Sequence, residues 1–104
     1  MDRRPLLVLA LVWTAALAPD AAAQRPDPNL GRNLAAACAN CHGTNGVSQP
    51  GMPGIAGQPR RYLEQQMQDF KAGKRPATLM HQIAKGYTDE QIGALAAYLS
   101  EQAR

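Results

Sequence analysis

The chain has 104 residues and a formal net charge of +3, from 11 lysines and arginines against 8 aspartates and glutamates. So mild a positive charge does not indicate nucleic-acid binding, although it is compatible with weak docking to an acidic patch on a protein partner. The length allows one domain, and because aromatic residues make up only 5% of the chain, we expect a large apolar cofactor to supply missing core volume.

The first 23 residues have the pattern of a secretory signal peptide. Arg3 and Arg4 precede an almost wholly apolar stretch over residues 6–17, and the alanines at positions 21–23 form an A-x-A cleavage site. The apolar stretch is short for a membrane span of about 20 residues, which makes a retained anchor the weaker alternative. We therefore expect a signal peptide at 1–23, a mature domain at 24–104, export to the periplasm and no membrane insertion after cleavage.

Cys38, Cys41 and His42 form a C-x-x-C-H motif, the spacing of a c-type haem attachment site. Two thiols three positions apart lie nearly one helical turn from each other and can face one side of a helix. Each thiol can form a thioether with one vinyl group of a porphyrin, and the imidazole of His42 can then bond the iron from one face. The motif occurs once, which predicts one covalent haem c.

Two other uses of a C-x-x-C pair fit the sequence less well. A structural zinc site needs about four ligands, and the remaining candidate of the usual kind is the distant His81. A thioredoxin-like redox pair needs a βαβ context, and no alternating β-branched stretch occurs near these cysteines.

The first and last predicted helices should cross. The first runs from about residue 28 to 39, begins after Asp27 as N-cap, and carries Leu30, Leu34 and Ala37 on one face. Gly31 removes a side chain from it, which suggests that another helix passes closely. The last helix begins at Thr88, which forms a capping box with Gln91, and it can place Tyr98 against that gap. Its expected buried face consists of Ile92, Leu95 and Leu99.

Two further helices are expected between these. One opens at Pro59 and ends near residue 72, with Leu63, Met67 and Phe70 on its buried side. A short helix follows the turn at residues 76–80 and ends at Gly86. The fold class is therefore all-α.

Residues 43–58 are rich in glycine and proline and lack periodicity, which predicts a loop. This loop can wrap the His42 side of a haem. A bound imidazole normally donates its other N–H to a backbone carbonyl or a carboxylate, and a carbonyl in the turn at Pro53 is our candidate. Met52, Ile55 and Ala56 are expected to line the pocket.

The second axial ligand has four candidates, of which Met80 is favoured. Met52 lies in the loop assigned to the face of His42, and Met67 lies on the buried side of its helix. Met80 follows a proline-containing turn 38 residues after His42, far enough along the chain to reach the opposite face. His81 would give bis-histidine ligation and a lower potential, and only one of these two adjacent residues can point at the iron.

These motifs resemble the class I c-type cytochromes over nearly all of the mature chain. Residues 38–43 and 53–58 are similar to the C-x-x-C-H-G and P-x-[LI]-A-G-Q blocks of the c4/c553 group. Residues 75–80 and 83–87 are similar to the monohaem cytochrome subunit of flavocytochrome c sulfide dehydrogenase. The resemblance implies a class I cytochrome c fold wrapped around one haem. In that family the residue matching Met80 is the distal iron ligand.

The resemblance also implies a function. The chain would accept electrons from an FAD-containing sulfide dehydrogenase subunit and pass them on, without bond-breaking chemistry of its own. The alternatives are a free-standing c553-like carrier that serves an oxidase or another dehydrogenase, and a ligand-binding or peroxidase-like haem protein in which the bond to Met80 is weak or absent. Arg60 and Arg61 are candidates for docking a partner, against the default of a solvated helix face.

Overall fold

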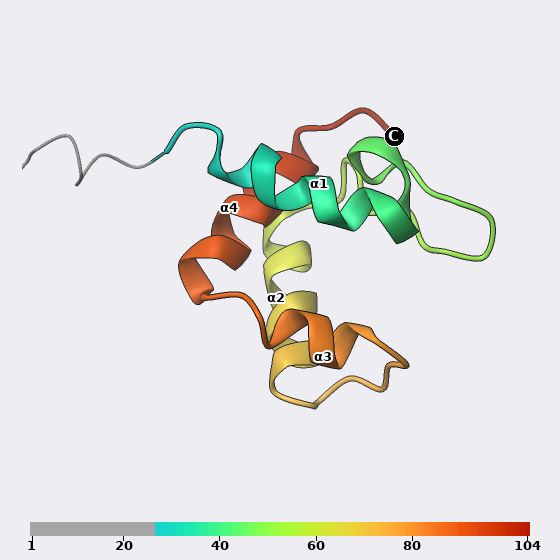
Figure 1. Ribbon diagram of the computed structural model, residues 1–104, viewed down its shortest axis with the longest axis vertical. Coiled ribbons are helices and arrows are strands. Elements are labelled where there is room, and N and C mark those ends of the chain that lie inside the picture. The colour runs from blue at the N-terminus through green and yellow to red at the C-terminus, as the bar shows by residue number, and fades with distance from the viewer. Residues whose placement is uncertain (1–26) are drawn as a thin grey trace, which may run out of the picture.

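A computed structural model describes residues 27–104 of the chain (Figure 1). This part contains four α-helices and one 3-10 turn and no strand, which confirms the all-α prediction. The predicted signal peptide at residues 1–23 lies outside the described residues. The elements in chain order are α1 (Leu30–His42), η1 (Thr44–Gly46), α2 (Arg60–Lys71), α3 (Met80–Ala84) and α4 (Asp89–Ser100).

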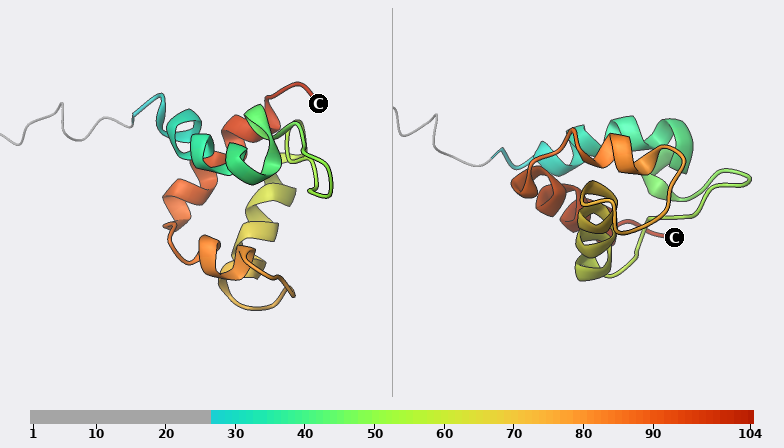
Figure 2. Two further views of the ribbon diagram at one scale, coloured as in Figure 1. Left: turned by 45° about the vertical axis from the view of Figure 1, so that its right-hand side comes forward. Right: turned by 90° about the horizontal axis from the view of Figure 1, so that it is seen from below.

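The first and last helices cross at a glycine, as predicted. A Cβ atom built on Gly31 would meet the carbonyl oxygen of Ala94 and lie 2.9 Å from the Cβ of Tyr98. Figure 2 shows α1 lying across α4. The missing side chain thus permits a close helix contact, and around it the buried core forms from Ala35, Leu63, Leu95, Ala96 and Leu99.

The predicted bounds and inner face of α1 need correction. The helix begins two residues later than expected and continues through the cysteines to His42. The side chain of Asp27 accepts a hydrogen bond from the Asn29 amide at 2.8 Å but lies before the N-cap position. Leu34 packs against the core as predicted, whereas Ala37 is exposed, because the face turned toward α4 passes through Gly31, Ala35 and Cys38.

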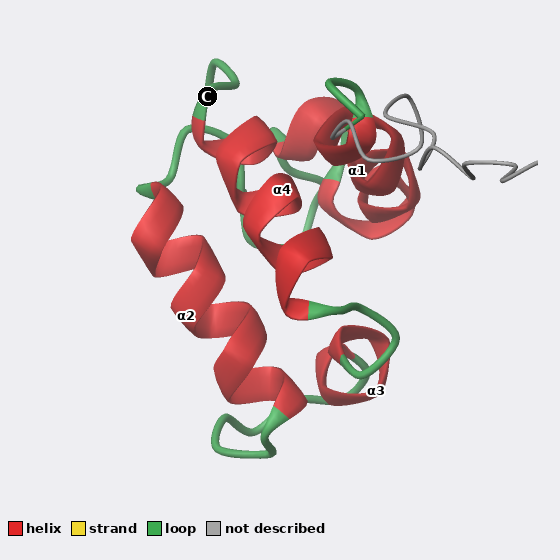
Figure 3. Cartoon of the chain, turned by 90° about the vertical axis from the view of Figure 1, so that its left-hand side faces the viewer, coloured by secondary structure: helices red, strands yellow, loops and turns green. Residues whose placement is uncertain are grey.

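α2 joins the crossed pair to α3. It packs against both α3 and α4, and Figure 3 shows α3 near the C-terminal end of α2. Leu63 is buried as predicted, whereas Met67 and Phe70 are half-buried. Pro59 occupies the N-cap position and not the first helical turn. No helix within residues 27–104 is long and apolar enough to cross a membrane.

The predicted capping box at the start of α4 is present. The Thr88 hydroxyl accepts a hydrogen bond from the Gln91 amide at 3.2 Å, and the Gln91 side chain accepts one from the Thr88 amide at 2.9 Å. The predicted inner face of this helix, Ile92, Leu95 and Leu99, is buried. Local sequence therefore positions both the start and the rotation of α4.

Candidate functional site

The last turn of α1 presents the C-x-x-C-H residues. Cys41 is exposed, and Cys38 is half-buried against the core; both thiols are free. Burial raises the pKa of the Cys38 thiol. Within residues 27–104, no three histidine, cysteine, aspartate or glutamate side chains lie close enough together to hold a metal ion, so His81 does not join the two cysteines in such a group. The helix therefore brings the thiols together without the further ligands that a zinc site requires.

The His42 imidazole is held by the loop that follows α1. The ring is buried, and its Nδ1 lies 2.8 Å from the carbonyl oxygen of Pro53, which is the hydrogen bond expected from the sequence. A neutral imidazole that donates from Nδ1 leaves Nε2 free to act as an acceptor or metal ligand. The protein thus fixes both the tautomer and the direction of this ring.

The loop reaches His42 because it folds back at two glycines. Gly43 and Gly46 have φ angles of 84° and 76°, which other residues adopt only with strain. The Gly46 carbonyl accepts hydrogen bonds from the amides of Ile55 at 2.8 Å and Ala56 at 2.9 Å. This pairing closes the loop and brings Pro53 over the end of α1.

Of the three residues expected to line a pocket, two pack into the protein. Ala56 is buried, and Ile55 packs against the core cluster. Met52 is exposed. Ile55 and Ala56 therefore support the loop from within, next to the backbone that carries Pro53.

Met80 is the first residue of α3 and is half-buried. Successive helical residues point about 100° apart, so Met80 and His81 cannot both face one iron. Nδ1 of His81 is a buried polar atom without a hydrogen-bond partner among the described residues. Met67, on α2, is half-buried. α3 packs on α2, whereas α1 and α3 are not among the packed pairs of helices.

The donor set and its surroundings fit a covalently attached porphyrin. Two free thiols and an oriented imidazole end one helix, and a thioether begins another. The loop after α1 and the start of α3 also expose large apolar side chains that a flat apolar cofactor could cover. These are Val47, Met52, Leu79 and Ile83.

Tyr87 also lies near this site, although the sequence indicated it only as part of the stretch 83–87 and assigned it no role. Its side chain is partly buried and, like that of Cys38, packs against the buried core cluster. Burial and the nearby Cys38 thiol raise the pKa of its phenol. Helical spacing from Met80 gives no signal for it, because α3 ends at Ala84, before Tyr87.

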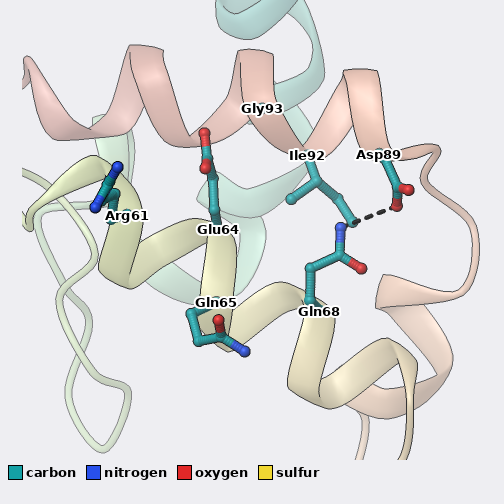
Figure 4. A pocket seen from close by; sticks show the side chains of 7 residues that line it. All are labelled: Arg61, Glu64, Gln65, Gln68, Asp89, Ile92 and Gly93. Atoms are coloured by element: carbon teal, nitrogen blue, oxygen red, sulfur yellow. Dashed lines mark hydrogen bonds between the residues drawn. The ribbon is translucent and has the colours of Figure 1, made fainter.

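A groove with a volume of about 530 Å³ lies elsewhere, between α2 and α4. Figure 4 shows that its visible lining is mostly polar, including Arg61, Glu64, Gln68 and Asp89. None of the predicted haem-binding residues lines it. A mixed polar and open groove does not fit an apolar macrocycle, and we do not assign the cofactor to it.

Comparison with known proteins adds independent findings. Residues 29–103 match the cytochrome c family. The cytochrome subunit of sulfide dehydrogenase from Chlorobaculum tepidum is 46% identical over 68 residues, covering 65% of this chain and 62% of that protein. Cytochrome c-554(548) from Halomonas halodenitrificans is 38% identical over 80 residues, covering 73% of this chain and 96% of that protein.

A solved structure is similar in fold as well. The structure of reduced cytochrome c4 from Pseudomonas stutzeri superposes with a TM-score of 0.64 at 26% identity and covers 74% of this chain. The chain spans half of that cytochrome c4 chain and 62% of the sulfide dehydrogenase subunit.

Proposed function

The chain belongs to the cytochrome c family, and from this premise we propose that it carries single electrons between redox proteins. Its fold is the all-helical cytochrome c fold, with four helices and no strands in residues 27–104. One haem c is attached covalently at Cys38 and Cys41, as this family and the C-x-x-C-H spacing imply. When bound, that haem supplies an iron that alternates between two oxidation states.

The observation that carries the proposal is the hydrogen bond between His42 and Pro53. With Nδ1 committed to the Pro53 carbonyl at 2.8 Å, Nε2 is the nitrogen left for iron. Such a bond fixes the ring orientation and raises the basicity of the ligating nitrogen. His42 is therefore our proximal ligand.

Met80 is our distal ligand. It begins a short helix that packs on α2, a different helix from the one that carries His42. Ligation by methionine and histidine raises the reduction potential of a haem relative to bis-histidine ligation. If His42 and Met80 both held the iron, substrates would have no access to it, and the haem would supply electron exchange alone.

Carbon monoxide binding to the reduced protein tests this ligand pair. The haem-loaded chain is purified from a host able to attach haem, and visible spectra are recorded in both redox states. We expect little carbon monoxide binding at neutral pH. Ready binding would favour a ligand-binding or peroxidase-like protein with a weak bond to Met80, and colourless protein would remove the proposal altogether.

We propose an FAD-containing sulfide dehydrogenase subunit as the electron donor. The similarity to the sulfide dehydrogenase cytochrome subunit supports this choice. A free-standing carrier to an oxidase or another dehydrogenase is the second candidate, and it is favoured by cytochrome c-554(548), 96% of whose length the chain covers. Stable co-purification with a yellow flavoprotein would support the subunit, whereas a monomeric red protein would support the carrier.

The docking surface we propose for this partner includes Arg60 and Arg61 at the start of α2. Arg60 forms an exposed ion pair with Glu64, with Nε and Oε1 2.8 Å apart. This ion pair partly neutralises the charge of Arg60, so Arg61 is the stronger candidate for attracting an acidic partner.

We also propose that the protein is exported to the periplasm and that its signal peptide is cleaved after residue 23. Mass spectrometry of the mature protein would give its N-terminus directly.

A further inference from the structure

The segment that carries Met80 depends on its neighbours for its position. α3 contains five residues, and an isolated helix of this length is not stable in water. Fully buried Ala84 anchors one side of it, and α3 as a whole packs on α2. A hydrogen bond beyond its C-terminal end adds a further restraint.

Lys71, the last residue of α2, holds the C-terminal end of the segment. Its Nζ donates a hydrogen bond of 2.7 Å to the carbonyl oxygen of Tyr87 and lies 3.5 Å from Oδ1 of Asp89. Gln68 donates to the same Oδ1 at 2.9 Å (Figure 4). Because Asp89 is the first residue of α4, these contacts tie the α3–α4 turn to α2.

The ammonium group of Lys71 makes a partly buried contact within the protein. Its hydrogen bond to Tyr87 is partly buried, and the side chain is 31% exposed. A hydrogen bond from a charged donor is shorter and stronger than one between neutral groups. Lys74 differs, since it is exposed and takes part in neither ion pair of residues 27–104.

Tyr87 connects this turn to the haem attachment site. Its carbonyl accepts the bond from Lys71, and its side chain packs against the same buried core cluster as that of Cys38. Its amide donates to the carbonyl of Ala84 at 3.2 Å, which continues the chain from the end of α3. One bond to the Tyr87 backbone therefore restrains both the ring that shares a core cluster with Cys38 and the helix that begins at Met80.

We propose that Lys71 is a positioning residue of the haem site, which restrains the Met80 segment against opening by holding the backbone of Tyr87. This inference rests on the proposed function, in which Met80 is the distal ligand. Without the ammonium group, the segment opens more often, and an external ligand more easily replaces Met80 at the iron.

The test compares haem-loaded wild type with Lys71→Leu and with Lys74→Leu, a matched control that removes the same charge three residues away. The apparent affinity of the ferric protein for imidazole is measured at constant pH, because imidazole binds after the segment has opened. We expect Lys71→Leu to raise this affinity about tenfold and Lys74→Leu to change it by less than about twofold. Lys71→Arg, which keeps a cationic donor, should have an affinity close to that of wild type. Equal affinities in the two leucine variants would overturn the proposal.

Hydrogen exchange tests the restraint whatever residue binds the iron. If wild-type ferric protein lacked the sulfur-to-iron charge-transfer band, Met80 would not be the distal ligand. Hydrogen exchange would then still test whether Lys71 restrains the segment. Exchange about tenfold faster in Lys71→Leu but not in Lys74→Leu supports the inference, and equal exchange overturns it. Should the leucine variant not fold, Lys71→Gln and Lys74→Gln are compared in the same way. The amides to follow are the hydrogen-bonded ones of Gln82, Ile83, Gly86 and Tyr87.

Discussion

Replacing Gly31 by alanine should destabilise the protein by forcing α1 and α4 apart. The new Cβ would meet backbone atoms, namely the carbonyl oxygen of Ala94 and, at 3.1 Å, its carbonyl carbon. Backbone in the middle of a helix cannot turn aside as a flexible side chain can. The Cβ of Tyr98, 2.9 Å away, is equally fixed.

The magnitude follows from two opposing effects. Overpacking costs about 1–3 kcal/mol, and alanine in place of glycine returns up to about 1 kcal/mol of helix propensity. A net loss of about 1–2 kcal/mol corresponds to a fall in Tm of roughly 5–15 °C for a domain of this size. Thermal unfolding of the haem-loaded protein, followed by far-ultraviolet circular dichroism, measures it.

Gly93 provides the matched control for this experiment. It also lies within a helix, but a Cβ there would have its nearest neighbours at 3.9 Å, in the side chains of Arg60 and Glu64. Gly93→Ala should therefore raise Tm by about 3–6 °C through propensity alone. If Gly31→Ala stabilised the protein as Gly93→Ala does, the close crossing of α1 and α4 would be refuted.

Three other predictions concern the ligand, the pH dependence and the docking surface. Met80→Ala should lower the reduction potential measured by voltammetry and admit external ligands, and an unchanged potential would show that another residue binds the iron. The hydrogen bond from Gln68 and the charge of Lys71 lower the pKa of Asp89, so its contribution to stability is present above the ordinary aspartate pKa of about 3.9 and is lost as the pH falls through the lowered value. Denaturant midpoints between neutral and acidic pH should therefore fall less in Asp89→Asn than in wild type; parallel curves would contradict this. Arg61→Glu should slow electron transfer from an acidic partner, with the difference disappearing at high salt, and an unaltered rate would return Arg61 to a solvated helix face.

Local patterns were sufficient for much of the fold. The capping box at Thr88 and Gln91 needs only residues three apart in the chain, and it was predicted correctly because such contacts form within one helical turn. The crossing at Gly31 was predicted because glycine destabilises a helix relative to alanine, and its missing side chain permits close packing of a second helix. The carbonyl of Pro53 was predicted from the general need of a ligating imidazole for a second partner.

The rotation and the bounds of α1 were harder to predict from the sequence. Ala37 was expected inside because its spacing places it on the face of Leu30 and Leu34, but the contact with α4 selects the face of Gly31 and Ala35. Periodicity alone could not choose between these two overlapping faces. The helix also continues to His42, whose imidazole Nδ1 then lies 2.8 Å from the carbonyl oxygen of Pro53 in the returning loop.

By itself the sequence determined which groups can hold a haem, because covalent attachment requires two thiols and an imidazole at a spacing that one helical turn provides. It also determined that the chain folds as helices, since their periodicity and caps are local. Only the tertiary structure decided how the Met80 segment is restrained. The contacts from Lys71 and Gln68 to Tyr87 and Asp89 join residues 16 to 21 positions apart, and polar side chains at such separations have no pattern that a sequence displays before the helices pack.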